Sequence, residues 1–208
     1  RSLRAAREEA SFMSFRGFYG IADSQFGDIG VQAELLLQAG ACAVQLRCKD
    51  WHPSRVEAEA QRLFPQFDQR NVPLIVNDLF LPHCSHGVHL GQEDGPLPRT
   101  RCPKGFLIGR STHSLPQLSQ AIAEGADYAG FGPIFGTQTK SNAGPSLGIE
   151  RLREAVALNL PLVAIGGISL ETLHQVQETG TAAWTAISAV WKAPDPRKAI
   201  EALSGSSD

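Results

Sequence analysis

The sequence predicts an α/β protein built as a single-domain (β/α)8 TIM barrel, and three observations lead to this prediction. Eight short apolar runs alternate with longer amphipathic segments along the chain. Glycine closes three of the amphipathic segments, at Gly40, Gly125 and Gly180, just before an apolar run, which is typical of helix ends. The length of 208 residues suits one domain, because each half of a two-domain chain would be short of core.

Each apolar run is an expected strand. The runs are continuous, which indicates strands buried on both faces, as in a parallel sheet. The expected strands cover residues 18–22, 42–47, 73–77, 87–90, 106–109, 127–132, 161–165 and 182–187. The expected helices cover 29–38, 53–69, 115–124, 149–158 and 170–179, with a helical turn after the third strand and a last helix from 195. A doubly wound open sheet stays as the alternative, because periodicity does not separate it from a barrel.

The chain is expected to have two parts, an N-terminal extension at 1–16 and the barrel at 17–205. Ala5, Ala6, Glu8 and Glu9 favour a helix in the extension. This segment either caps the barrel floor or is disordered.

The composition argues against several classes of function. A net charge of −2 without a basic run argues against nucleic acid as a partner. No apolar run approaches the length of a membrane span, so no membrane partner is expected. Cys42, Cys48, Cys84 and Cys102 form no C-x-x-C pair, which favours reduced thiols in a cytoplasmic protein over a zinc or redox site. A homo-oligomer is compatible with the sequence.

Polar side chains follow most of the expected strands, where a TIM barrel carries its active site. Arg47, Lys49 and Lys140 are positive charges suited to phosphate oxygens. Asp78 and Asp94 follow adjacent strands and can converge. One or two carboxylates together with substrate phosphates usually hold Mg²⁺, and the histidines are poorly spaced for Zn²⁺. The pattern therefore favours an anionic ligand and a Mg²⁺ or Mn²⁺ ion.

A second anion site is expected after the seventh and eighth strands. Gly166 and Gly167 follow the seventh strand and Ser188 follows the eighth, the common phosphate site of this fold. Each feature alone has an ordinary explanation, since paired glycines form turns and aspartates cap helices. Their conjunction at six of eight strand ends favours function. Two phosphate sites indicate two phosphorylated substrates or one long one.

Six motifs, in this order, resemble those of the thiamine phosphate synthase family, and the resemblance covers nearly the whole barrel. The ordered set is specific, although each motif alone is weak. The motifs are Gln45-Leu46-Arg47-x-Lys49, Val76-Asn77-Asp78, Val88-His89-Leu90-Gly91-Gln92-Glu93-Asp94, Ser111-Thr112-His113-Ser114, Thr137-x-Thr139-Lys140 and Ala164-Ile165-Gly166-Gly167-Ile168.

The resemblance implies a transferase that joins hydroxymethylpyrimidine diphosphate to a thiazole phosphate and releases pyrophosphate. Departure of pyrophosphate would leave a pyrimidine-stabilised carbocation, which the thiazole nitrogen captures without a protein nucleophile. The resemblance assigns Mg²⁺ to Asp78 and Asp94, and the pyrimidine to Gln45. It assigns the diphosphate to Arg47, Lys49, Asn77, Ser111 and Lys140, of which Arg47, Lys49, Ser111 and Lys140 would be catalytic, and the thiazole phosphate to Thr137, Thr139, Gly167 and Ser188.

The chain departs from the family pattern at three places. Cys48 stands where an acidic residue is usual, and Arg110 stands where a small or apolar residue is usual. The segment 79–86 is about one helical turn short and contains Pro82. We expect Arg110 to contact the diphosphate or to form an ion pair that replaces the charge lost at Cys48; the alternative is a guanidinium that extends into solvent. We expect 136–147 to be a mobile lid. The alternatives to the synthase are the related thiazole tautomerase and a non-catalytic barrel that binds a phosphorylated ligand.

Overall fold

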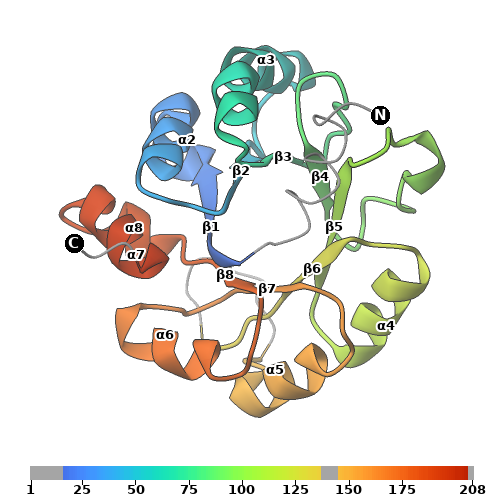
Figure 1. The fold of residues 1–208 in the computed structure, drawn as a ribbon, viewed down its shortest axis with the longest axis vertical. Helices are drawn as coiled ribbons and strands as arrows, with labels where there is room; N and C mark the ends of the chain where they lie inside the picture. The colour runs from blue at the N-terminus through green and yellow to red at the C-terminus, as the bar shows by residue number, and fades with distance from the viewer. Residues whose placement is uncertain (1–15, 137–144, 206–208) are drawn as a thin grey trace.

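The computed structural model describes residues 16–136 and 145–205, which form a closed barrel of parallel strands in the order β1 to β8 (Figure 1). β1 pairs with both β2 and β8, so the sheet has no free edge. The predicted TIM barrel is confirmed, and the open sheet is excluded. The strands are β1 (Gly17–Asp23), β2 (Ala43–Arg47), β3 (Leu74–Asn77), β4 (Gly87–Leu90), β5 (Leu107–Thr112), β6 (Tyr128–Phe131), β7 (Leu162–Ala164) and β8 (Ala183–Trp184).

Helices surround this barrel on its outer side (Figure 1). Their first turns are capped as the sequence allows: Asp28 accepts from the backbone of Val31, and Ser114 accepts from that of Gln117. None of the described helices has the length and apolar content of a membrane crossing. The helices are α2 (Ile29–Gln38), α3 (Pro53–Arg70), α4 (Leu115–Ala123), α5 (Gly148–Val156), α6 (Leu170–Gln177), α7 (Ser188–Trp191) and α8 (Pro196–Ser204), with short 3-10 turns η1 (Ser24–Phe26) and η2 (Arg99–Arg101).

Two neighbouring crossovers differ from complete β/α repeats. The described residues between β3 and β4 form turns, and those between β4 and β5 form only η2. Proline disfavours a regular helix in both, because its ring removes an N–H donor and clashes within a helix. Pro82 lies in the first crossover, and Pro96, Pro98 and Pro103 lie in the second. The outer side of β4 and β5 is therefore covered by irregular chain.

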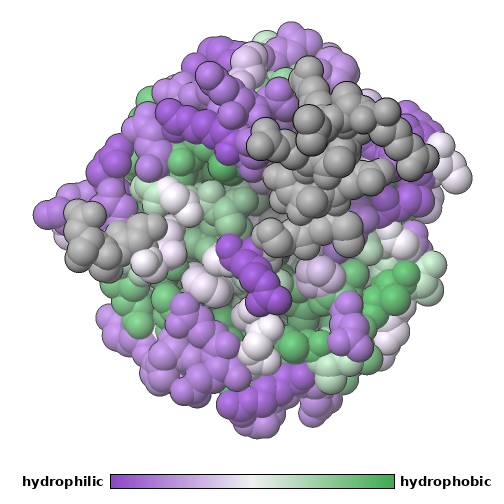
Figure 2. Space-filling view, in the orientation of Figure 1, coloured by the Kyte–Doolittle hydropathy of each residue, from purple (hydrophilic) through white to green (hydrophobic). Residues whose placement is uncertain are grey.

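The core has two layers, as in other barrels of this kind. The inner layer fills the barrel and includes Tyr19, Ile75, Tyr128 and Val163. The outer layer lies between the strands and the helices, where Phe67 is fully buried. Figure 2 shows hydrophilic residues over the outward sides of α3 and α5 and hydrophobic residues nearer the barrel. The expected N-terminal helix at 1–16 lies outside the described residues, except for Arg16.

Candidate active site at the barrel mouth

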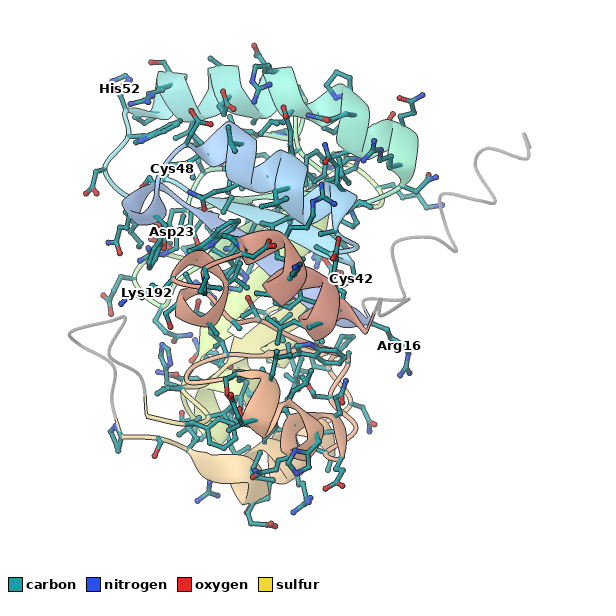
Figure 3. All side chains as sticks on the ribbon, turned by 90° about the vertical axis from the view of Figure 1, so that its left-hand side faces the viewer. Arg16, Asp23, Cys42, Cys48, His52 and Lys192 are labelled. Carbon is teal, nitrogen blue, oxygen red and sulfur yellow. The ribbon has the colours of Figure 1, made fainter. Side chains whose placement is uncertain are left out.

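The carboxyl ends of the strands form one end of the barrel, which we call the mouth. Figure 3 shows Asp23, at the end of β1, and Cys48, just after β2, on this side, opposite Arg16 and Cys42. The predicted site residues that the structure describes lie at or after these strand ends. Because the strands are parallel, these residues lie at one end of the barrel.

Arg47 forms a buried ion pair with Asp23. Its Nη1 donates to Asp23 Oδ2 at 2.6 Å, and the side chains are 15% and 1% exposed. The two residues are register partners in β1 and β2, which brings their side chains to the same level of the mouth. Asp23 Oδ1 also accepts from the backbone of Gln25 at 3.0 Å. Asp23 therefore fixes one face of the Arg47 guanidinium, while other N–H groups stay able to bind an anion.

Lys49, Asp78 and Asp94 form a second charged group. Lys49 Nζ lies 3.1 Å from Asp78 Oδ2, and the Asp78 carboxyl is in hydrogen-bond contact with that of Asp94. Partial burial raises the pKa of Asp78 above its ordinary value, and Asp94 raises it further, while Lys49 opposes the shift. Asp78 also has a left-handed backbone, with φ of 64°, a conformation that in non-glycine residues is often found at functional sites. The convergence predicted for the two carboxylates is what the structure shows.

Neutral polar groups complete the mouth. Gln45 Nε2 donates to Asn77 Oδ1 at 2.8 Å, which joins two predicted substrate residues. Ser111 Oγ lies 2.9 Å from His89 Nε2. The other ring nitrogen of His89 lies 3.1 Å from the Tyr128 hydroxyl. That hydroxyl lies 3.0 Å from the hydroxyl of Tyr19, so a hydrogen-bonded chain runs from Ser111 into the barrel interior.

A small pocket opens into the barrel at this level. Thr185 lies on its wall, 1% exposed, and its hydroxyl has no hydrogen-bond partner among the described residues. An unpaired buried hydroxyl is costly, so a ligand or water in this pocket would find a hydroxyl to pair with. The wall residues are Tyr19, Ile21, Gln45, His89, Ser111, Thr112, His113, Tyr128, Gly130, Val163, Ile165 and Thr185.

The predicted second phosphate site follows β7 and β8, which are neighbours in the sheet. Gly167 has φ of +66°, and a Cβ there would lie 2.6 Å from the Gly136 carbonyl oxygen. Only glycine fits, because the segment after β6 packs directly against the Gly167 backbone. Ser188 begins α7, and residues 185–187 separate it from the end of β8. The remaining predicted residues, Thr137, Thr139 and Lys140, lie outside the described residues, as does most of the expected lid at 136–147.

Arg110 forms an ion pair, but not the expected one that would replace the charge lost at Cys48. Its Nη2 lies 3.1 Å from Glu124 Oε2, just after α4, so the partner is not near the position of Cys48 in the chain. Arg110 is 5% exposed and lies in β5 between Gly109 and Ser111. The Ser111 side chain, and the direction that a Cβ would take at Gly109, face His89 inside the barrel. By strand alternation its own side chain points outward. The alternative expectation, a diphosphate contact, has no support in this geometry.

Sequence reasoning missed two residues of the mouth. Asp23 ends the first strand and holds Arg47, and only the strand register shows this pairing. His89 is not among the residues that the sequence predicts for the site, yet it is the hydrogen-bond partner of the predicted catalytic Ser111. Position at a strand end is the signal that marks Asp23. Among the described residues, no group of three or more His, Cys, Asp and Glu side chains is arranged around a metal position.

Comparison with known proteins agrees with the resemblance seen in the motifs. The family model described as thiamine monophosphate synthase matches residues 18–190. A thiamine-phosphate synthase of Synechococcus sp. (strain WH7803) is 42% identical over 178 residues, 83% of this chain and 50% of that protein. Another, of Roseiflexus sp. (strain RS-1), is 40% identical over 173 residues, 80% of this chain and 73% of that protein. This chain thus spans about half the length of the Synechococcus relative.

The fold agrees with the same family. Thiamine phosphate pyrophosphorylase from Pyrococcus furiosus has a TM-score of 0.81 and 30% sequence identity, with 92% of this chain and 95% of that chain covered. The family match takes in β1 to β8, and with them every strand end described above. On its sequence and on its fold, the chain belongs to the thiamine monophosphate synthase family.

Proposed function

We propose that this chain is a Mg²⁺-dependent transferase that joins hydroxymethylpyrimidine diphosphate to thiazole phosphate and releases pyrophosphate. The observation that carries the proposal is the charged group Lys49–Asp78–Asp94 beside the pair Arg47–Asp23. A diphosphate leaving group calls for positive charge, and a metal bridging it to the protein calls for carboxylates. Both are present at one mouth.

The carboxylates fit a divalent cation. Partial burial and the contact with Asp94 raise the pKa of Asp78, and a shared cation would relieve the repulsion between the two carboxylates. Asp78 and Asp94 would hold Mg²⁺, which when bound would neutralise charge on the leaving pyrophosphate. Metal dependence stays a proposal, as does a cytoplasmic location.

The chain's own residues would position the two substrates. Arg47 and Lys49 would bind the diphosphate oxygens, with Asp23 fixing the guanidinium. Ser111 would add a hydroxyl whose orientation His89 sets. Gln45, oriented by Asn77, would contact the pyrimidine ring at the pocket wall. Gly167 would bring backbone groups close to the thiazole phosphate. Catalysis would then be positioning and charge neutralisation, without a protein nucleophile.

The test is release of pyrophosphate by the purified chain with both substrates and Mg²⁺. Omission of either substrate, or addition of a chelator, should abolish the release. Asp78→Asn should lose turnover. Asp50→Asn, at an exposed aspartate in the turn after β2, is the matched control and should keep it. Isomerisation of a thiazole phosphate without metal would favour the tautomerase. Pyrophosphate binding without ligation would favour the non-catalytic barrel.

A further inference from the structure

The segment that carries Asp94 lacks the support that an α-helix gives in the complete β/α repeats. It belongs to the crossover between β4 and β5, whose described residues contain no α-helix. Residues 92–96 are exposed, and apolar packing of this crossover begins only at Leu97. The space between the segment and α4 is a cavity of about 240 Å³. Hydrogen bonds, not packing, must therefore hold Asp94 in place.

Arg110 supplies those bonds at both ends of the segment. Its Nη1 donates to the carbonyl oxygen of Gly91 at 2.6 Å, and its Nη2 donates to that of Gly95 at 2.7 Å. A planar guanidinium holds two acceptors in a fixed geometry, which a lysine ammonium does not. Gln92 adds one more bond, from its amide to the Ser111 carbonyl oxygen.

The bond to Gly91 leads directly to Asp94. The backbone N–H of Gly91 donates to Asp94 Oδ2, and the N–H of Asp94 donates to the Gly91 oxygen that Arg110 also binds. Asp94 Oδ2 thus accepts from the peptide group before the Gly91 Cα atom, and Arg110 binds the carbonyl of the peptide group after it. Arg110 therefore acts on the carboxylate through the backbone of Gly91, and through the bond between the Gly91 oxygen and the N–H of Asp94. Gly95, with φ of +77°, closes the turn behind Asp94.

Glu124 holds Arg110 from the other side. Its Oε2 accepts from Arg110 Nη2, and its Oε1 accepts from Gln120 of α4 at 2.8 Å. The hydrogen bonds of Gln120 and Arg110 lower the pKa of Glu124, so this partner stays ionised at neutral pH. The network runs from α4 through Arg110 to the turn that orients Asp94.

We propose that Arg110 is a positioning residue, which fixes the Asp94 carboxylate for the divalent cation and thereby takes over the role of the missing helix. The proposal rests on the proposed function, since it concerns the metal of that same site. Residues that orient metal ligands typically change metal affinity by about 10- to 100-fold when they are replaced.

The experiment measures Mn²⁺ binding in the presence of pyrophosphate, by electron paramagnetic resonance of the free ion, together with thermal unfolding. Arg110→Met keeps an unbranched side chain and removes the fork, and it should weaken Mn²⁺ binding about tenfold. Arg99→Met is the matched control. Arg99 lies in the same crossover as Asp94, and it also binds a carbonyl oxygen, that of Gly125, and a carboxylate, that of Asp127. Arg99→Met should therefore lower stability without changing Mn²⁺ affinity.

The outcomes separate the proposal from its foundation. If Arg110→Met binds Mn²⁺ as tightly as the wild type, or if Arg99→Met loses as much affinity as Arg110→Met, the positioning role is overturned. The proposed function still stands in that case, provided that the wild-type protein forms thiamine phosphate. Absence of Mn²⁺–pyrophosphate binding and of ligation in the wild type would overturn both. Arg110→Lys keeps the charge and covers the case in which Arg110→Met does not fold. An intermediate loss in Arg110→Lys supports the two-carbonyl anchor, and full affinity would overturn it.

Discussion

The ion pair of Asp23 and Arg47 offers the sharpest test of how the mouth is built. We consider Asp23→Asn, Arg47→Met and the double variant. Asp23→Asn keeps an oxygen that can accept from the backbone of Gln25, so the change removes charge more than shape. Removing one partner of a buried pair costs roughly 3–5 kcal/mol, because the other charge stays buried. Arg47 is 15% exposed, so we expect each single variant to lie near the lower end, about 3 kcal/mol.

The exposed pair Arg62–Glu34 is the matched control. Its Nη1···Oε1 distance of 2.9 Å is similar, but the side chains are 52% and 36% exposed. Exposed pairs contribute about 0.2–1 kcal/mol. Urea unfolding of both double-mutant cycles gives the coupling energy, and we expect about 2 kcal/mol or more for Asp23–Arg47. A coupling below about 1 kcal/mol, no larger than that of the control pair, would refute the claim that Asp23 fixes Arg47.

Three further predictions concern the mouth and the barrel interior. Burial and Asp94 raise the pKa of Asp78, so the charged form of Asp78 destabilises the folded state at neutral pH. Asp78→Asn should therefore raise the melting temperature of the metal-free protein at pH 7. The gain should shrink as the pH falls and Asp78 takes up a proton, and a gain that grows toward acid in thermal unfolding would contradict this sign. Thr185→Val removes a buried hydroxyl that has no partner among the described residues, and urea unfolding should show stabilisation by about 1 kcal/mol; a loss of that size would mean that the hydroxyl is already bonded. Tyr128→Phe removes the hydrogen bonds to His89 and Tyr19 and should lower the free energy of unfolding by about 1–2 kcal/mol. An unchanged unfolding midpoint would show that these hydrogen bonds contribute little to stability.

The strands were predictable because both of their faces are buried, which leaves continuous apolar runs in the sequence. The last run shows the limit of this reasoning. Residues 182–187 were predicted as a strand, but β8 covers only Ala183–Trp184, and Ile187 already has helical dihedrals as the cap of α7. Hydrophobicity marks burial and does not mark where the backbone turns from one element into the next.

The convergence of the charged residues was predictable from topology, because all parallel strands end at one face. Pairings were not, since they depend on register. Asp23 pairs with Arg47 because the two lie opposite each other in β1 and β2. Leu90 lies opposite Arg110 in β4 and β5, which places the guanidinium beside the turn after β4. The prolines of this crossover were visible, but the loss of a helix there gives Arg110 a role that no local motif indicates.

The most direct measurement of the central claim is a single turnover with the chain in excess over hydroxymethylpyrimidine diphosphate, with Mg²⁺ and thiazole phosphate present. Mass spectrometry quantifies thiamine phosphate and pyrophosphate in the same sample. Because Arg47, Lys49 and the two carboxylates would hold the diphosphate beside a second phosphorylated substrate, the account predicts one thiamine phosphate for each pyrophosphate released. Pyrophosphate without thiamine phosphate, or neither product, would contradict it.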